Sequence, residues 1–474
     1  MTEVLLYALG VLIMLIGLAV SIALHEVGHL VPAKLFGVKV TQYMVGFGKT
    51  IWSRRKGETE YGVKAIPLGG YVAMTGMYPP VKPGGRARDS STGFFDGMVQ
   101  EQTEEGAVVS DRSPDAPEPS RLRRGFVEMI DEARQASADT IDEGEDRRTF
   151  YRLPVWKKII VMLGGPFMNL VLAFVFFGIV LMGFGVSQYS TTLGYVSQCL
   201  LPASSERTTC TGEDPAAPAA AAGLVAGDRI VSIDGIEIEQ WTQLREIVAA
   251  SPDRALDVRI EREGAVRELV LTPAASERWI VDANGEALLG ADGQPLTETV
   301  GMIGVTPATE IVKQPITEVP AFVGDNVAQV AQVIIGLPQR MVDIWNAAFG
   351  TEDRDPNGPI GVVGVGRLAG EIVSLDEAPI AARSQLILSL LGSLNVALFV
   401  FNLVPLMPLD GGHVAGALYE GAKRRLFKLF GKADPGPVDT AKMVPVTFAV
   451  VIVLGAMSVL LLYADIVKPV SLFG

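Results

Sequence analysis

The stretch SIALHEVGHLVPA, Ser21 to Ala33, decides how this chain is interpreted. It places two histidines and a glutamate at the end of a run that is otherwise composed like a membrane span. A helix brings residues i and i+4 onto one face, so His25 and His29 can reach the same ion, and Glu26 lies beside them. In the pattern His-Glu-x-x-His the histidines bind zinc and the glutamate acts as a general base toward water.

Lipid around this motif strengthens the functional interpretation. One ionisable side chain at the centre of a bilayer costs about 2.5–3.5 kcal/mol on insertion scales, so three together indicate a site. The alternative is that they only mark the membrane surface, which short His and Glu side chains reach poorly. We therefore expect a Zn²⁺ site at this helix end.

Four long runs without charged residues predict four transmembrane helices. Each has about 20 residues or more, enough to cross roughly 30 Å of hydrocarbon as a helix. A cleaved signal peptide is the alternative for the first run, but no basic residue precedes it and no small-residue cleavage site follows it. The runs are Val4 to Leu24, Ile159 to Val186, Leu386 to Leu409 and Val444 to Ala464.

Charge sets the expected orientation. The formal net charge of -13 argues against nucleic-acid binding, which requires a basic surface. Lys and Arg gather between the first and second runs and between the third and fourth, whereas few lie near the ends of the segment between the second and third. The positive-inside rule then predicts a multi-pass protein of the plasma membrane with both termini extracytoplasmic.

Two histidines leave at least one protein ligand to be found. The third histidine of the chain is His413, and Asp410 lies just before it, at the end of the third run. The first and third runs cross the membrane in the same direction, so their inner ends, with the first two histidines and Asp410, should meet at one depth. We therefore favour Asp410 as the third ligand, with His413 as the competing candidate.

The segment between the second and third runs contains a recognisable unit. It includes AAGLVAGDRIVSIDGIEI, then WTQLREIVAAS with helical spacing, then ALDVRIEREGAVRELVLTP with period-two alternation. From about Thr191 to Thr306 this resembles a PDZ domain, which binds an extended peptide by adding a strand beside a helix. The groove is expected near TTLGYV and the helix that begins at Trp241; a steric module without a peptide ligand is the alternative.

The two cysteines, Cys199 and Cys210, both lie in this outer segment. A disulfide that closes the short loop between them suits an oxidising compartment, and two unpaired thiols are the alternative.

The motifs together resemble the site-2 protease family, in particular bacterial intramembrane zinc metalloproteases of the regulator-of-sigma-E protease type. The resemblance rests on HExxH in the first span, GGPFMN (Gly164 to Asn169) in the second, Asn-x-x-Pro…Leu-Asp-Gly (Asn402 to Gly411) in the third, and one PDZ-like unit. It covers the chain except for an acidic insert.

The resemblance implies a zinc endopeptidase. Zinc would be held by His25, His29 and Asp410, with Glu26 as the base. The substrates would be single-span membrane proteins, such as anti-sigma factors or remnant signal peptides, cut inside the bilayer near its cytoplasmic side.

Further residues are expected to hold the substrate. Asn169 and Asn402 match groups that bind its unwound backbone, whose freed amides need partners in lipid; hydrogen bonds between helices are the alternative. Ile66 to Met74 resembles the family's membrane-associated β-element, which would pair with the extended chain. Its residues expected at the substrate are Gly69, Gly70 and Tyr71.

The predicted fold is an α-helical multi-pass membrane protein with a cytoplasmic membrane-associated β-element and one extracytoplasmic PDZ domain of α/β type. The expected segments are the first transmembrane helix 1–36, the β-element 37–78, an acidic, largely disordered cytoplasmic insert 79–150, the second transmembrane helix 151–188, the PDZ-like domain 189–306, an amphipathic outer helix and linker 307–384, the third transmembrane helix with the Leu-Asp-Gly motif 385–412, a basic cytoplasmic loop 413–442 and the fourth transmembrane helix 443–474.

Two other functions remain to be weighed. A catalytically silent adaptor could use the PDZ-like unit to hold partners, but it has no need of all four site residues. A metal transporter needs polar groups along a whole path, whereas the sequence places them at one depth.

Overall fold

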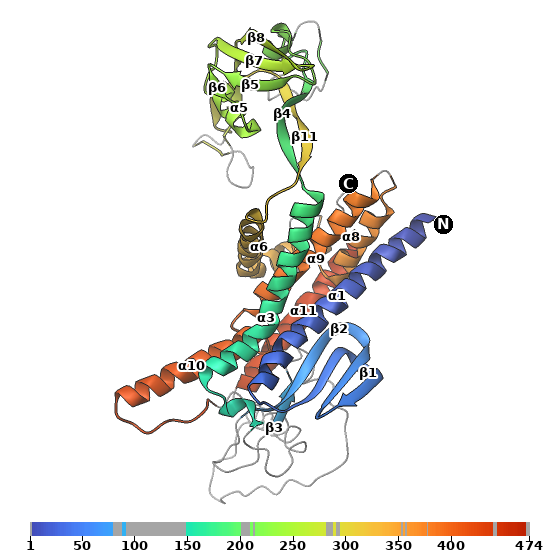
Figure 1. Cartoon of the computed structure of the whole chain (residues 1–474), viewed down its shortest axis with the longest axis vertical. Helices are drawn as coiled ribbons and strands as arrows, with labels where there is room; N and C mark the ends of the chain where they lie inside the picture. Colours follow the sequence, from blue (N-terminus) through green and yellow to red (C-terminus); the bar gives the residue numbers. More distant parts are fainter. Residues whose placement is uncertain are drawn as a thin grey trace, which may run out of the picture. The chain divides into compact units, whose positions relative to one another are not determined.

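The chain folds into two compact units in the computed structural model. The first comprises Met1–Phe184 and Pro315–Gly474, and the second comprises Gly185–Gln314 (Figure 1). The structure describes residues 2–78, 88–91, 148–200, 209–211, 214–280, 288–290, 294–351, 354–355, 358–376, 378–438 and 443–470.

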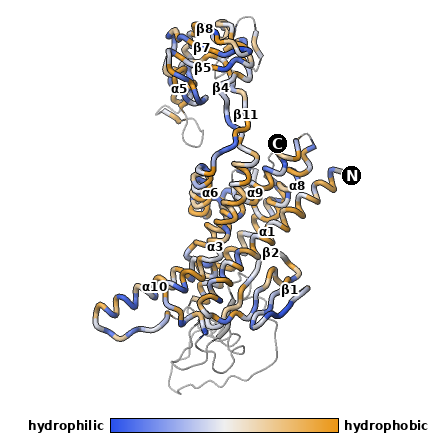
Figure 2. The backbone as a smooth tube through the Cα atoms, in the orientation of Figure 1, coloured by the Kyte–Doolittle hydropathy of each residue, from blue (hydrophilic) through white to orange (hydrophobic). Residues whose placement is uncertain are grey.

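Among the described residues of the first unit, four helices are long and apolar enough to cross a membrane, which confirms a multi-pass helical protein. Hydrophobic residues predominate along them (Figure 2). They are α1 (Thr2–Leu35), α3 (Val155–Gly178) with its π-helical continuation η4 (Ile179–Phe184), α9 (Ile380–Asn402) and α11 (Val444–Val467).

The expected amphipathic outer helix is two helices. α6 (Glu318–Ile335) and α7 (Leu337–Phe349) are bent by 69° at Gly336 and together form a fifth candidate span. A further helix, α8 (Val362–Ser374), was not expected from the sequence. It lies against α1 so closely that a Cβ at Gly10 would come within 2.3 Å of the carbonyl oxygen of Ala369.

Small residues let α1 meet its neighbours. A Cβ on Gly28 would lie 2.2 Å from the carbonyl oxygen of Gly164, so the backbones of α1 and α3 touch there. On α9, Asn395 Nδ2 donates to Ser21 Oγ at 3.0 Å, and Leu391 covers Gly17. Residue numbers rise together along these α1 and α9 contacts, so the two helices run in the same direction, as predicted.

The third membrane helix ends earlier than expected. The predicted span 385–412 carried Asp410 at its end, but α9 stops at Asn402 and Asp410 is the first residue of α10 (Asp410–Leu429). Pro405 and Pro408 explain the break, because proline lacks an N–H and disfavours helix in the residue before it. Much of the expected basic loop 413–442 is therefore helix.

The predicted β-element forms a sheet beside α1. It consists of β1 (Val40–Lys56), β2 (Thr59–Tyr78) and β3 (Arg88–Ser91). The first two strands bend, so Tyr43 of β1 pairs with two parts of β2, at Tyr61 and at Val72. β3 pairs with β2 from Ala73 onward.

Most of the predicted acidic insert 79–150 lies outside the described residues. At its end, Arg148 forms a two-pronged ion pair with Glu58, with both N–O distances 2.7 Å. The chain then passes through a short 3₁₀ turn, η3 (Phe150–Arg152), into α3.

The second unit is a β-sheet domain, and its described residues include two short helices. Its sheet has the order β11-β4-β5-β7-β8, with β6 paired to β5, and β9 and β10 form a separate hairpin. Leu193, Ile230 and Leu256 are part of its apolar core. The elements are β4 (Val186–Val196), α4 (Pro218–Ala221), β5 (Arg229–Ile233), β6 (Ile236–Glu237), α5 (Trp241–Ala249), β7 (Leu256–Arg262), β8 (Ala265–Leu271), β9 (Ala274–Trp279), β10 (Thr297–Met302) and β11 (Val305–Val312).

Three details of this unit confirm sequence predictions. A helix begins at Trp241, a hairpin turns at Glu263 and Gly264, and Cys199 is bonded to Cys210. The TTLGYV strand, β4, has β11 on one side and meets β5 on the other through the Thr192–Arg229 pair.

Candidate metal centre

Three buried side chains from two distant segments converge in the first unit. His25 and His29 come from one face of α1, and Asp410 comes from the first turn of α10. The two Nε2 atoms are 3.2 Å apart, and Asp410 Oδ2 lies 3.3 Å from that of His25 and 3.4 Å from that of His29. The predicted cluster is therefore assembled.

The spacing of the three ligand atoms matches a tetrahedral zinc site. Bonds of about 2.0–2.2 Å at tetrahedral angles place neighbouring ligand atoms roughly 3.3–3.6 Å apart. The observed triangle has sides of 3.2, 3.3 and 3.4 Å. Three protein ligands with an open fourth position are the arrangement of a catalytic zinc rather than a structural one.

The hydrogen bonds of His29 show why a cation fits here. Its Nδ1 lies 2.8 Å from the carbonyl oxygen of Val161, which can only accept, so Nδ1 carries a proton; in the neutral ring that binds a metal, Nε2 then presents a lone pair. That lone pair faces Asp410 Oδ2, which is buried without a hydrogen-bond partner among the described residues. Two buried acceptors repel one another, and a metal ion between them removes the conflict.

Positive charge in this cluster favours the ionised form of Asp410. Burial by itself would raise the pKa of Asp410, but the two imidazoles, when they are protonated, hold it well below its usual range, and a bound cation would take over their role.

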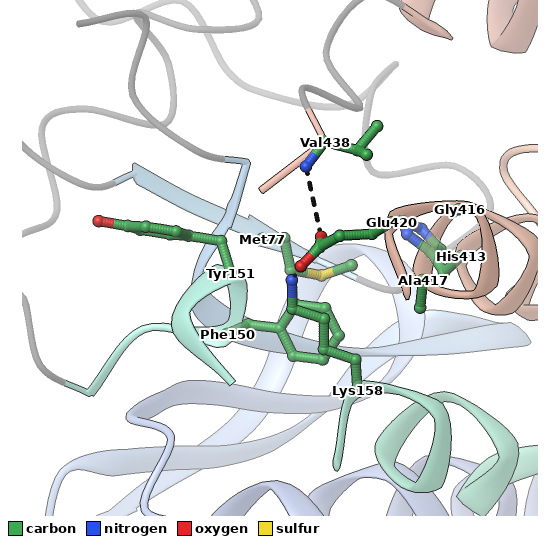
Figure 3. Close-up of a pocket in the computed structure, with 9 residues that line it drawn as sticks. All are labelled: Met77, Phe150, Tyr151, Lys158, His413, Gly416, Ala417, Glu420 and Val438. Atoms are coloured by element: carbon green, nitrogen blue, oxygen red, sulfur yellow. Dashed lines mark hydrogen bonds and ion pairs between the residues drawn. The ribbon is translucent and has the colours of Figure 1, made fainter. Parts of the chain in front are cut away.

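His413, the competing ligand, is not part of the cluster. It lines a small neighbouring pocket of about 30 Å³ together with Lys158 and Glu420 (Figure 3). Burial lowers the pKa of His413 to about 4, so its ring is neutral at pH 7.

The same pocket contains an ion pair that fastens α10 to α3. Glu420 Oε2 lies 2.8 Å from Lys158 Nζ and accepts a longer bond from the Val438 backbone N–H, drawn as a dashed line in Figure 3. Since α10 begins with Asp410, the Lys158–Glu420 ion pair helps to fix the direction from which the Asp410 carboxylate approaches the histidines.

Two residues of the GGPFMN motif face the histidines. A Cβ at Gly165 would come within 2.2 Å of His29 Nε2 and 2.7 Å of His25 Nε2, so any larger residue would fill the space of the ion. Asn169 Nδ2 lies 3.0 Å from His25 Nδ1, on the far side of that ring.

The β-element approaches the site on the side of Glu26. A Cβ at Gly70 would lie 3.0 Å from Glu26 Cγ. The Tyr43 hydroxyl donates to the Ala23 carbonyl at 2.8 Å, and burial together with the charge of Glu26 raises the pKa of Tyr43 to about 12.

The other expected substrate residues lie in different settings. Gly69, with φ of 153°, lies against the Phe47 ring. Tyr71 is buried and its hydroxyl donates to Gln42 Oε1 at 3.0 Å. Asn402 is the last residue of α9, and its side chain is half-buried.

Sequence reasoning missed two contributors to this centre. The Val161 carbonyl has no signature, because any residue could supply it. Gly165 belongs to a motif that was noticed for its resemblance and not for the space it leaves. Outside the centre, Asn395, buried in the third span and bonded to Ser21, was not singled out either, although a lone amide in an apolar run is a signal.

Comparison with known proteins agrees with the geometry. The model of peptidase family M50 matches residues 13–433. The zinc metalloprotease Rip1 of Mycolicibacterium smegmatis is 30% identical over 99% of this chain and 100% of its own length. Rip1 of Mycobacterium tuberculosis is 29% identical over the same shares, and the metalloprotease MmpA of Caulobacter vibrioides is 27% identical over 88% of this chain and 89% of its own.

Proposed function

This chain belongs to peptidase family M50 and is an intramembrane zinc metalloprotease, and from that premise we propose which substrates it takes and how its residues act. The substrates are single-span membrane proteins, such as anti-sigma factors or remnant signal peptides, cut inside the bilayer near its cytoplasmic face.

The observation that carries the proposal is the buried trio His25, His29 and Asp410, whose two histidines lie on a helix long enough to span a membrane. Zinc held there supplies a Lewis acid that polarises the scissile carbonyl and makes water acidic enough to deprotonate near pH 7. Glu26 takes the proton from the attacking water and passes it to the amine that leaves.

A substrate helix has to unwind before it can be cut, and its freed amides then need partners. We assign this role to β2 at Gly69 and Gly70, next to Glu26. β3 pairs with β2 only from Ala73 onward, so it does not cover these two glycines. An extended substrate would add along it as a strand. Asn402 is proposed to bind the same stretch of substrate; the contact of Asn169 with His25 supports a different role for that residue.

The second unit is proposed to be the PDZ domain, on the extracytoplasmic side. β11 stands at the end of its sheet, so an extended peptide would add at β11 rather than along β4. In this role the unit screens substrates and admits chains already shortened by another protease. Both termini of the protein would lie on that same side, in accordance with the distribution of basic residues.

The test is Glu26→Gln in the purified full-length protein, with a model single-span substrate in liposomes. We expect zinc content to stay at the wild-type level and cleavage to fall by about 10²–10⁴-fold. Glu3→Gln, at the other end of the same helix, is the matched control and should cleave normally. Unchanged cleavage by Glu26→Gln would contradict the assignment, and a wild type that holds partners without cutting them would support the adaptor.

A further inference from the structure

Asn169 and His25 form a buried contact in which the amide NH₂ group, as placed, faces a ring nitrogen and so requires that nitrogen to accept. Asn169 Nδ2 lies 3.0 Å from His25 Nδ1. Both side chains are buried, and Asn169 Oδ1 is buried without a hydrogen-bond partner among the described residues. A buried acceptor that lacks a donor costs about 1–3 kcal/mol, so the arrangement calls for an explanation.

The chemistry of the metal site decides which atom of Asn169 should face the ring. His25 directs Nε2 toward Asp410 and His29, so Nε2 must offer its lone pair to zinc. A neutral imidazole then carries its proton on Nδ1 and needs an acceptor there. The NH₂ group of Asn169 can only donate, whereas its oxygen can accept.

Turning the amide by 180° resolves the conflict. The oxygen and NH₂ group of an amide are nearly equal in size, so the exchange needs no other movement. Oδ1 then accepts the Nδ1–H of His25, and the NH₂ group takes the position that Oδ1 occupied. We propose that Asn169 is a positioning residue, which holds His25 in the tautomer that binds zinc.

His29 offers a parallel within the same site. Its Nδ1 donates to the Val161 carbonyl, which also belongs to α3. Both ligand rings of α1 would then be oriented from the neighbouring helix, one by a backbone oxygen and one by the side-chain oxygen of Asn169. This assignment rests on the zinc site formed with Asp410, and it replaces substrate binding as the role of Asn169.

The test uses two substitutions of Asn169 and a matched buried asparagine. Asn169→Asp keeps the shape and offers only acceptor oxygens, and Asn169→Leu removes the acceptor. Asn395→Leu is the control, because Asn395 is also fully buried with an unpartnered Oδ1, but it bonds Ser21 and not a ligand. The zinc dissociation constant of each full-length protein is measured by competition with a chelator, and thermal unfolding of the zinc-free forms reports folding.

We expect Asn169→Leu to weaken zinc binding about 10- to 100-fold, the range for removed partners of ligating histidines. Asn169→Asp should bind zinc as tightly as the wild type or more tightly, and Asn395→Leu should keep wild-type affinity. Zinc binding by Asn169→Asp that is weaker than by Asn169→Leu would overturn the inference, as would unchanged affinity in Asn169→Leu. Failure of the wild type itself to bind zinc would instead overturn the metal centre.

Discussion

Asp410 and Asp465 are both buried carboxylates of the membrane unit, yet their partners differ completely. Asp465, near the end of α11, lies 2.9 Å from Arg354 Nη1, and its Oδ2 accepts the backbone N–H groups of Gly361 and Gly364 at 2.9 and 2.8 Å. Asp410 faces two imidazole nitrogens and has an Oδ2 without a hydrogen-bond donor among the described residues.

The difference teaches how to tell a structural carboxylate from a metal ligand in a low-dielectric interior. The chain itself supplies Asp465 with a cation and with the positive N-terminal end of α8. Around Asp410 the chain supplies the two histidine Nε2 atoms, which in the neutral rings that bind a metal present lone pairs. Such a carboxylate is tolerable only when a cation arrives from outside, so the partners and not the burial identify the site.

The largest expected effect is loss of the metal from Asp410→Ala. Zinc content should fall well below one per chain, and cleavage of a single-span substrate should fall by at least about 1,000-fold, because both the Lewis acid and the activated water are lost. Metal analysis and cleavage assays on the same samples measure this. Asp465→Asn is the control and should retain zinc. Full zinc content in Asp410→Ala would contradict the assignment of Asp410 as a metal ligand.

Asp465→Ala should affect stability instead. It leaves Arg354 buried and unpaired, which costs about 3–5 kcal/mol of unfolding free energy. Thermal unfolding measures the loss, while the zinc affinity of the folded protein should stay as in the wild type. Reduced zinc affinity at unchanged stability would show that Asp465 acts on the metal centre after all.

Gly165→Ala tests the space that the ion needs. Its Cβ would enter the gap between the two Nε2 atoms, so we expect zinc affinity to fall about 100-fold, comparable to the loss of an important outer partner. Gly178→Ala, in the same helix with open space around its Cβ position, is the control and should bind zinc normally. Equal affinities in the two variants would exclude a cation at this position.

A third buried carboxylate, Asp228 of the second unit, sharpens the comparison through its pH dependence. Burial alone would raise the pKa of Asp228, but hydrogen bonds from Arg262 and from the Val225 N–H outweigh it and hold the pKa below its usual value. The pair therefore stabilises the fold above the ordinary Asp pKa of about 3.9, and this contribution is lost as the pH falls through the lower folded-state value.

Hydrogen exchange in β5 and β7 of the intact chain measures this effect. Protection should weaken as the pH falls from 5 toward 3, after correction for the intrinsic exchange rate. Arg262→Gln should weaken protection at pH 7 and make it respond less to acid, because the charged partner of Asp228 is gone. A wild type that gains protection on acidification would reverse the sign argued here.

Much of the centre could be predicted from particular residues. Helical spacing brought His25 and His29 together, and the common direction of two spans favoured Asp410 over His413, which the structure confirms. The limits of the third span were wrong, because an apolar run continues through Pro405 and Pro408 although the helix cannot. Helix α8 was missed because its apolar residues are too few to indicate a span.

The sequence by itself determined the membrane helices and the zinc-binding motif, because a bilayer demands long apolar runs and a helix repeats every 3.6 residues. The tertiary structure alone decided which atoms surround each ligand: the Val161 carbonyl behind His29, the amide of Asn169 behind His25, and the space above Gly165. Those contacts join segments far apart in the chain, and a backbone oxygen or an empty volume is not encoded by the identity of any one residue.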